Sequence, residues 1–190
     1  MFDVDDLVAD CKSAMAEAEP RLAVKEVLEE AVTRATLVAS ALPADRACFA
    51  PLYTADDLSV MHVVWGPGMR IPPHNHLMWS AVGLYDGRED NMLYRRVGSD
   101  IAVSGGKELS TGDVAVLGDD TIHAVHNPLG RFTCAIHVYG GDITTRAGRS
   151  EWNADTFEEA PFDFKRAQQY FVIANSEATT SSDARAGYPD

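Results

Sequence analysis

Histidine is the residue type whose spacing in this chain points most clearly to chemistry. Most of the 6 histidines fall into two close groups, with two further single positions: His74 with His76, His123 with His126, then His137, and His62 on an earlier segment. In an extended segment, residues i and i+2 project to the same face, so His74 and His76 can point at one ion. The prolines directly before them favour that extended backbone.

A third ligand must come from a distant segment, because two imidazoles from one strand leave most coordination positions of a cation open. We expect His123 to be that ligand. His126 is the alternative, but in an extended segment it lies on the opposite face from His123, so one of the two should lie outside the ligand set. Three imidazoles suit iron(II), which we expect, and also zinc, nickel or manganese.

The elements that must position these histidines are mainly strands. After Pro43, glycine becomes frequent and short runs rich in β-branched and aromatic residues alternate with turn signals, which is typical of a sandwich or barrel. Residues 4–42 contain no glycine and show helical spacing, interrupted at Pro20. We therefore expect a helical segment at 1–42, a barrel with a short C-terminal helix at 43–174, and a flexible tail at 175–190.

Composition narrows the class of partner. The 190 residues carry a formal net charge of -13, which would repel phosphate backbones and anionic lipids, so a small molecule is the expected ligand, with neither nucleic acid nor membrane. The N-terminus lacks a basic region followed by an apolar one. The 3 cysteines are widely separated, as expected in a reducing compartment. These features predict a cytoplasmic protein, and they leave its oligomeric state open.

The spacing around the histidines resembles the two motifs of the cupin superfamily. Five residues separate Gly68 from His74, and six residues separate position 80 from Gly87. The later segment Gly112-Asp113 through His123 to Asn127 resembles the second motif. The resemblance implies a mainly β fold, the double-stranded β-helix barrel, with N-terminal helices packed on it. It also implies a glutamate ligand at position 80, where this chain has Ser80.

Within the cupins, the chain resembles the thiol dioxygenases, which bind iron through three histidines and oxidise a thiol to a sulfinate. The resemblance rests on Leu52-Tyr53-Thr54, on the two histidine motifs and on the run from Ile136 to Asp142. It implies that His137 and Tyr139 form a hydrogen-bonded relay beside the metal. The family's serine at the outer end of that relay is replaced here by Ala135.

The expected substrate-binding residues also follow from this resemblance. Animal cysteine dioxygenases place an arginine where this chain has Ala55, whereas bacterial relatives that prefer 3-mercaptopropionate place one beyond the relay tyrosine. Arg149 resembles that arginine, and Arg146 is a second candidate. Trp79 is expected in an apolar wall of the pocket. The resemblance thus implies dioxygen and a small thiol carboxylate as substrates.

Two other functions fit a cupin with three histidines. One is an enzyme that acts on a carbon substrate such as a β-diketone or a flavonol-like enolate. The other is a non-catalytic cupin that binds a metal or a metabolite. The replacements at Ala55 and Ala135 keep both alternatives open.

Overall fold

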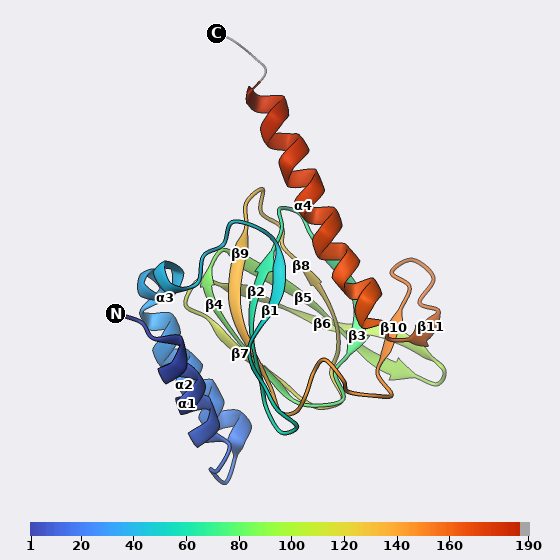
Figure 1. The fold of residues 1–190 in the computed structure, drawn as a ribbon. Coiled ribbons are helices and arrows are strands. Elements are labelled where there is room, and N and C mark those ends of the chain that lie inside the picture. Colours follow the sequence, from blue (N-terminus) through green and yellow to red (C-terminus); the bar gives the residue numbers. More distant parts are fainter. Residues whose placement is uncertain (187–190) are drawn as a thin grey trace.

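The structure is a computed structural model that describes residues 1–186 (Figure 1). The helices are α1 (Val4–Ala14), α2 (Pro20–Thr33), α3 (Ala35–Ala41) and α4 (Phe164–Ala186). The strands are β1 (Cys48–Thr54), β2 (Ser59–Trp65), β3 (Arg70–Asn75), β4 (Ser80–Asp86), β5 (Arg88–Val97), β6 (Asp100–Ser110), β7 (Val114–Leu117), β8 (Ile122–His126), β9 (Thr133–Tyr139), β10 (Ser150–Trp152) and β11 (Glu159–Pro161).

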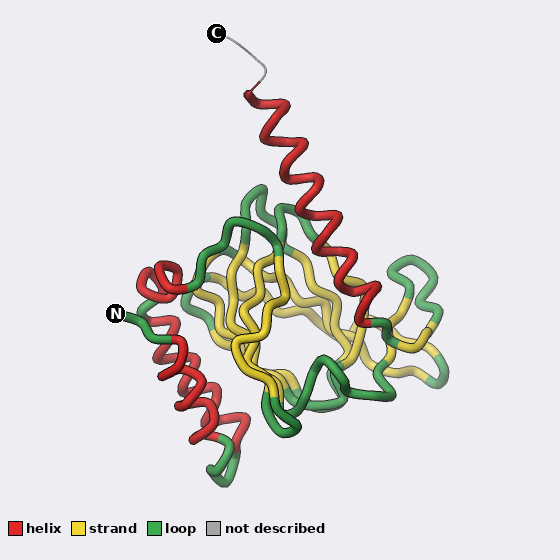
Figure 2. The backbone as a smooth tube through the Cα atoms, in the orientation of Figure 1, coloured by secondary structure: helices red, strands yellow, loops and turns green. Residues whose placement is uncertain are grey.

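The strands form two antiparallel sheets that enclose a barrel (Figure 2). One sheet has the order β1-β2-β9-β4-β7 and the other has the order β11-β10-β3-β8-β5-β6. From β2 to β9, successive strands alternate between the two sheets, apart from the β5–β6 hairpin. This winding is the double-stranded β-helix, or jelly roll. The predicted mainly β, cupin-type fold is therefore confirmed.

The central strands of the first sheet are buried on both faces. Every residue of β2 and of β9 is buried, which agrees with their largely apolar sequences. Along β9, Cys134, Ile136 and Val138 face the N-terminal helices, whereas Ala135 and Tyr139 belong to clusters inside the barrel. The alternation thus places Ala135, His137 and Tyr139 on the interior face.

The N-terminal helices cover the outer face of that sheet (Figure 1). Helix α2 begins at Pro20, a position where the missing N–H of proline costs nothing. Its side chains Val24, Leu28 and Ala31 are fully or almost fully buried in one cluster with strand residues of β2, β4 and β9. At Gly83 the approach is close, because an added Cβ would lie 3.3 Å from Leu28 Cβ. The helical segment at 1–42 is thus part of the core.

Helix α4 packs against β1 and β3 and projects beyond the barrel (Figure 1), and it is longer than the sequence predicts. Asn175 donates from Nδ2 to the Ala47 carbonyl at 3.0 Å and accepts from the Ala47 N–H at 2.7 Å. Ala174 is buried against Gly66. These contacts hold the helix at Ala174 and Asn175 to the start of β1. The helix continues through Ala186, over part of the segment for which a flexible tail is predicted. Residues 187–190 of that tail lie outside the described residues.

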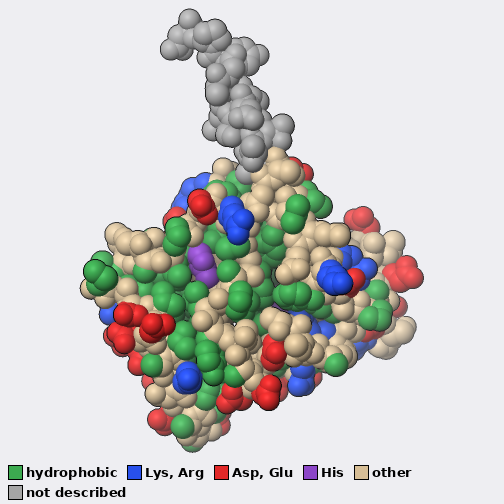
Figure 3. Space-filling view, in the orientation of Figure 1, with side chains coloured by type: hydrophobic (Ala, Val, Ile, Leu, Met, Phe, Trp, Pro, Cys, Tyr) green, Lys and Arg blue, Asp and Glu red, His purple; other side chains and the backbone are tan. Residues whose placement is uncertain are grey.

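The surface mixes charges of both signs with apolar side chains. Figure 3 shows Asp and Glu side chains interspersed with basic and hydrophobic ones over the face in view. In the part of the chain that the structure describes, no helix is both long enough and apolar enough to cross a membrane.

The packing of α2 predicts that two leucines of this helix contribute very differently to the free energy of unfolding. Leu28 is fully buried, whereas Leu22 is 46% exposed. Leu28→Ala should lower the free energy of unfolding by about 2–5 kcal/mol, because it leaves a cavity between helix and sheet. Leu22→Ala should change it by less than about 0.5 kcal/mol. Urea unfolding followed by circular dichroism measures both, and equal losses would contradict the placement of α2.

Candidate metal centre and its cavity

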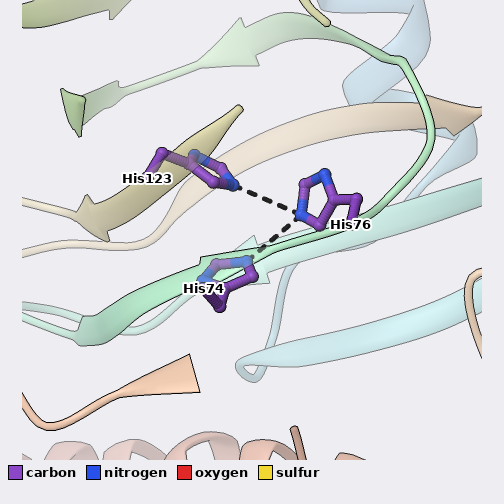
Figure 4. A group of neighbouring side chains, drawn as sticks. All are labelled: His74, His76 and His123. Atoms are coloured by element: carbon purple, nitrogen blue, oxygen red, sulfur yellow. Dashed lines mark hydrogen bonds between the residues drawn. The ribbon is translucent and has the colours of Figure 1, made fainter. Parts of the chain in front are cut away.

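Three imidazole rings converge on one point inside the barrel (Figure 4). His76 Nε2 lies 3.1 Å from His74 Nε2 and 3.3 Å from His123 Nε2. The ligand atoms of the three residues all lie within 4.8 Å of one another, and all three side chains are buried. The predicted set of His74, His76 and His123 is therefore brought together by the fold.

The pairing of β3 with β8 produces this convergence. His74 lies directly opposite His123 in the antiparallel register, and Ile71 lies opposite Val125. Three residue steps of β3 thus span the same length as two of β8, which makes a bulge at Pro72-Pro73. Proline is suited to a bulge because it has no N–H to contribute to the ladder. The bulge sets which residues of β3 face the barrel interior.

The outer nitrogens of the rings are held by hydrogen-bonding partners. His74 Nδ1 donates to the Pro72 carbonyl at 3.0 Å, and His123 Nδ1 donates to Asn91 Oδ1 at 2.7 Å. A hydrogen on Nδ1 leaves Nε2 with a free lone pair, as a metal ligand requires. His76 Nδ1 has a longer contact of 3.5 Å with the Ser80 hydroxyl.

This arrangement fits a metal ion. Facing lone pairs on neighbouring Nε2 atoms repel each other, and a divalent cation between them would relieve the repulsion. Burial lowers the pKa of His74 to about 4, with a further contribution from the nearby Arg149 cation. Burial, followed by the neighbouring imidazoles, also lowers the pKa of His76 and of His123. The three rings are therefore neutral at pH 7, the form that binds metals.

Ser80 and His126 lie outside the ligand set. Ser80 is fully buried, but its hydroxyl contacts the Nδ1 of His76 rather than the inner side of the ring. His126 is only partly buried and lies opposite Arg70 on the neighbouring strand. As the alternation along β8 predicts, His123 and His126 point to opposite faces, and His123 is the one that faces inward.

The three histidines open onto a small cavity of about 60 Å³. Its other lining residues are mostly apolar and come from strands, loops and α4: Phe49, Trp65, Ile71, Val125, His137, Tyr139, Ile143, Arg149, Phe162, Phe164, Ala167, Gln168 and Phe171. The α4 residues Phe164, Ala167, Gln168 and Phe171 have the spacing of one helical face. That spacing is readable in the sequence, but nothing in it shows that this face covers a metal site.

Arg149 brings a buried cation to this cavity. It is 7% exposed, and its guanidinium lies 3.7 Å from the Phe162 ring centre. Its Nε donates to the Asn75 carbonyl at 2.9 Å and its Nη1 to the Ile143 carbonyl at 3.0 Å. Burial lowers the pKa of Arg149 to about 10, so the side chain stays charged at neutral pH. No carboxylate of the described residues lies within ion-pair distance of it.

Tyr139 lies beside the histidines with its predicted partner. Its ring centre lies 5.1 Å from that of His76, and its hydroxyl lies 3.2 Å from His137 Nδ1. Burial raises the pKa of Tyr139, so the phenol keeps its proton at neutral pH. Ala135, two residues before His137 on the same face, offers no hydrogen-bonding group there.

Two predicted substrate-binding residues are not part of the cavity lining. Trp79 packs against Gly140 and the cluster of the N-terminal helices, because it comes directly before Ser80, whose side chain faces the interior. Arg146 is exposed on the loop that precedes Arg149. The structure therefore separates the two candidate arginines, and it leaves Trp79 on the other side of the sheet.

Glu89 is the residue of the site region that sequence reasoning missed. It is fully buried inside the barrel, where its carboxylate accepts hydrogen bonds from Trp65 Nε1 at 2.6 Å and from Asn91 Nδ2 at 2.9 Å. Burial alone would raise the pKa of Glu89, but the adjacent His137 and these two donors lower it, so the group is charged. Because Glu89 lies between Arg88 and Asp90, its sequence context indicates a surface residue. The residues that it contacts, such as Trp65 and His137, lie far away in the sequence.

Comparison with known proteins gives weak likenesses. No family model matches the chain. An RmlC-like cupin from Methanocaldococcus jannaschii is 12% identical, with a TM-score of 0.45 over 53% of this chain and 85% of that one. A Bacillus halodurans protein is 19% identical, with a TM-score of 0.46 over 60% and 76%. A DMSP lyase from Ruegeria pomeroyi is 18% identical, with a TM-score of 0.44 over 58% and 54%. The fold assignment rests on the chain's own strand order.

The geometry makes a prediction for two histidines of the same strand. His123→Ala should abolish binding of zinc or iron(II), because it removes one of three ligands, whereas His126→Ala should leave it unchanged. Isothermal titration of the metal-free proteins under anaerobic conditions measures both. Loss of binding in His126→Ala with retention in His123→Ala would show that the third ligand is misassigned.

Proposed function

We propose that this chain is a mononuclear non-haem iron(II) dioxygenase that oxidises a small thiol carboxylate to its sulfinate. The observation that carries the proposal is Arg149, a buried cation with no carboxylate of the described residues within ion-pair distance, in the same cavity as the three histidines. Buried charges are ordinarily paired, so the cavity is suited to an anionic ligand. A carboxylate would supply the missing charge.

The size of the cavity favours a small substrate. A cavity needs about 10–15 Å³ per water molecule, so about 60 Å³ corresponds to roughly four to six non-hydrogen atoms. This is the size of a short mercapto acid, and a flavonol is much larger. The apolar walls of Phe49, Phe164 and Phe171 would surround the carbon chain.

The reaction is R–SH + O₂ → R–SO₂H, in which sulfur gives up four electrons to dioxygen and both oxygen atoms become bonded to sulfur. Iron(II) held by His74, His76 and His123 would supply the redox chemistry. Arg149 would bind the carboxylate: its Nε and Nη1 each donate one hydrogen bond to the backbone, and the other N–H groups of its five remain to donate. The Tyr139 hydroxyl, protonated at neutral pH, would donate a hydrogen bond to the reacting groups.

The proposal is tested by oxygen uptake after anaerobic loading with iron(II). The substrates are 3-mercaptopropionate, cysteine, cysteamine and acetylacetone. We expect one oxygen molecule consumed per 3-mercaptopropionate and much slower uptake with cysteamine, which lacks the carboxylate. Absence of uptake with every thiol would overturn the proposal, and uptake with acetylacetone alone would favour a carbon substrate.

A second prediction compares the two arginines. Arg149→Gln should raise KM for 3-mercaptopropionate roughly 10- to 100-fold, because it removes charged hydrogen bonds to the carboxylate. Arg146→Gln removes the same charge from an exposed position and should leave KM unchanged. Thermal unfolding of both variants shows whether Arg149→Gln acts only through stability. Equal KM values in the two variants would place the carboxylate elsewhere.

A further inference from the structure

The Glu89 carboxylate is shared by two chains of polar contacts, called arms below. The first arm runs through His137 to Tyr139, and the second runs through Asn91 to His123. Its Oε2 accepts from Trp65 Nε1 at 2.6 Å and lies 3.3 Å from His137 Nε2, while its Oε1 accepts from Asn91 Nδ2 at 2.9 Å. It is the one fully buried carboxylate among the described residues. A carboxylate on the interior of a barrel is costly unless it is well hydrogen-bonded, and here it faces three nitrogen groups.

The first arm leads to the relay tyrosine. An ionised carboxylate can only accept hydrogen bonds, so His137 Nε2 beside Glu89 must carry its hydrogen. Glu89 Oε2 and His137 Nε2 lie within ion-pair distance but lack hydrogen-bond geometry, and that nitrogen has no hydrogen-bond partner among the described residues. In the neutral ring, Nδ1 then has a free lone pair, which in the absence of substrate can accept the hydrogen of the Tyr139 hydroxyl 3.2 Å away. Glu89 thereby decides which side of the imidazole faces Tyr139 as an acceptor.

The second arm leads to a metal ligand. Because the Asn91 amide directs its NH₂ group at Glu89, its oxygen faces His123 Nδ1 at 2.7 Å. An oxygen acceptor at this position requires the His123 hydrogen on Nδ1, which leaves Nε2 free to bind a metal. The orientation of one amide, set by Glu89, thus decides whether His123 is a ligand.

We propose that Glu89 is a positioning residue that sets the proton positions of His123 and His137 together. It also places a negative charge one residue away from the ligand His123, behind Asn91, in a site whose ligand set contains no carboxylate. This inference concerns the histidines whatever the substrate is, so its test can fail or succeed separately from the thiol reaction.

Glu89→Gln tests the arm to the metal. Trp65 Nε1 can only donate, so the oxygen of the introduced amide must face it, and the introduced NH₂ group must face Asn91. Asn91 then turns its own oxygen to that NH₂ group and its own NH₂ to His123, which moves the His123 hydrogen to Nε2. We expect the zinc affinity to fall about 10- to 100-fold. Asp90→Asn is the matched control, because it removes the same charge from the adjacent, partly exposed residue that pairs with Arg88, and it should bind zinc as the wild type does.

Glu89→Met tests the arm to the tyrosine. The apolar side chain has a similar length but cannot accept a hydrogen bond, so the His137 hydrogen should move to Nδ1 and be donated to the Tyr139 oxygen. The ¹⁵N shifts of histidine in the metal-free proteins at pH 7 report the tautomer of each ring directly. We expect the wild type to show His123 protonated on Nδ1 and His137 protonated on Nε2, with His123 switched in Glu89→Gln and His137 switched in Glu89→Met.

The wild-type spectrum alone can overturn the proposal, so the test remains valid even where a variant fails to fold. Either wild-type ring in the opposite tautomer would contradict it. Unchanged zinc affinity and unchanged tautomers in a folded Glu89→Gln would show that Glu89 only fills space, and an equal loss of affinity in Asp90→Asn would show a general effect of charge.

Discussion

The register between β3 and β8 is the constraint on which the site depends. His74 can share an ion with His123 because the two residues lie opposite each other in neighbouring strands, and a shift by one residue would turn one of them out of the barrel. The bulge at Pro72-Pro73 belongs to the same constraint, since it absorbs an extra residue before His74. His76 follows directly after β3 and completes the group from the end of the same segment.

Placing polar groups inside an apolar barrel requires that each one be satisfied. The outer nitrogen of His74 uses a backbone carbonyl, and that of His123 uses Asn91, which is itself held by Glu89. Arg149 reaches the same region because β10 pairs with β3, with Glu151 opposite His74, and its guanidinium bonds two backbone carbonyls. The site is therefore a connected set of buried groups in which the position of each hydrogen constrains the next.

Sequence patterns predict which face of a strand or helix a side chain lies on. Whether that side chain is buried, and which residues it contacts, depends on the tertiary fold. Alternation along a strand is a local property, so it correctly separates His123 from His126. For Trp79 the expectation rested on the family resemblance, whereas alternation with the inward-facing Ser80 turns Trp79 to the outer side of the sheet. Glu89 is one acidic residue among many until β2 and β9 bring its partners to it. Likewise, helix α4 is recognisable as a cover for the cavity only from its contacts with the start of β1.

Because the ligand set contains no carboxylate, a bound metal would keep its full charge in this site. Ser80 leaves three neutral imidazoles to hold a doubly charged ion, and Arg149 adds a further positive charge to the same cavity. Glu89 offsets only part of this charge and is separated from the ion by Asn91 and His123. The cavity therefore keeps a net positive potential when a metal is bound, and an anionic ligand with two charged ends, one for the metal and one for Arg149, is the kind that it would stabilise most.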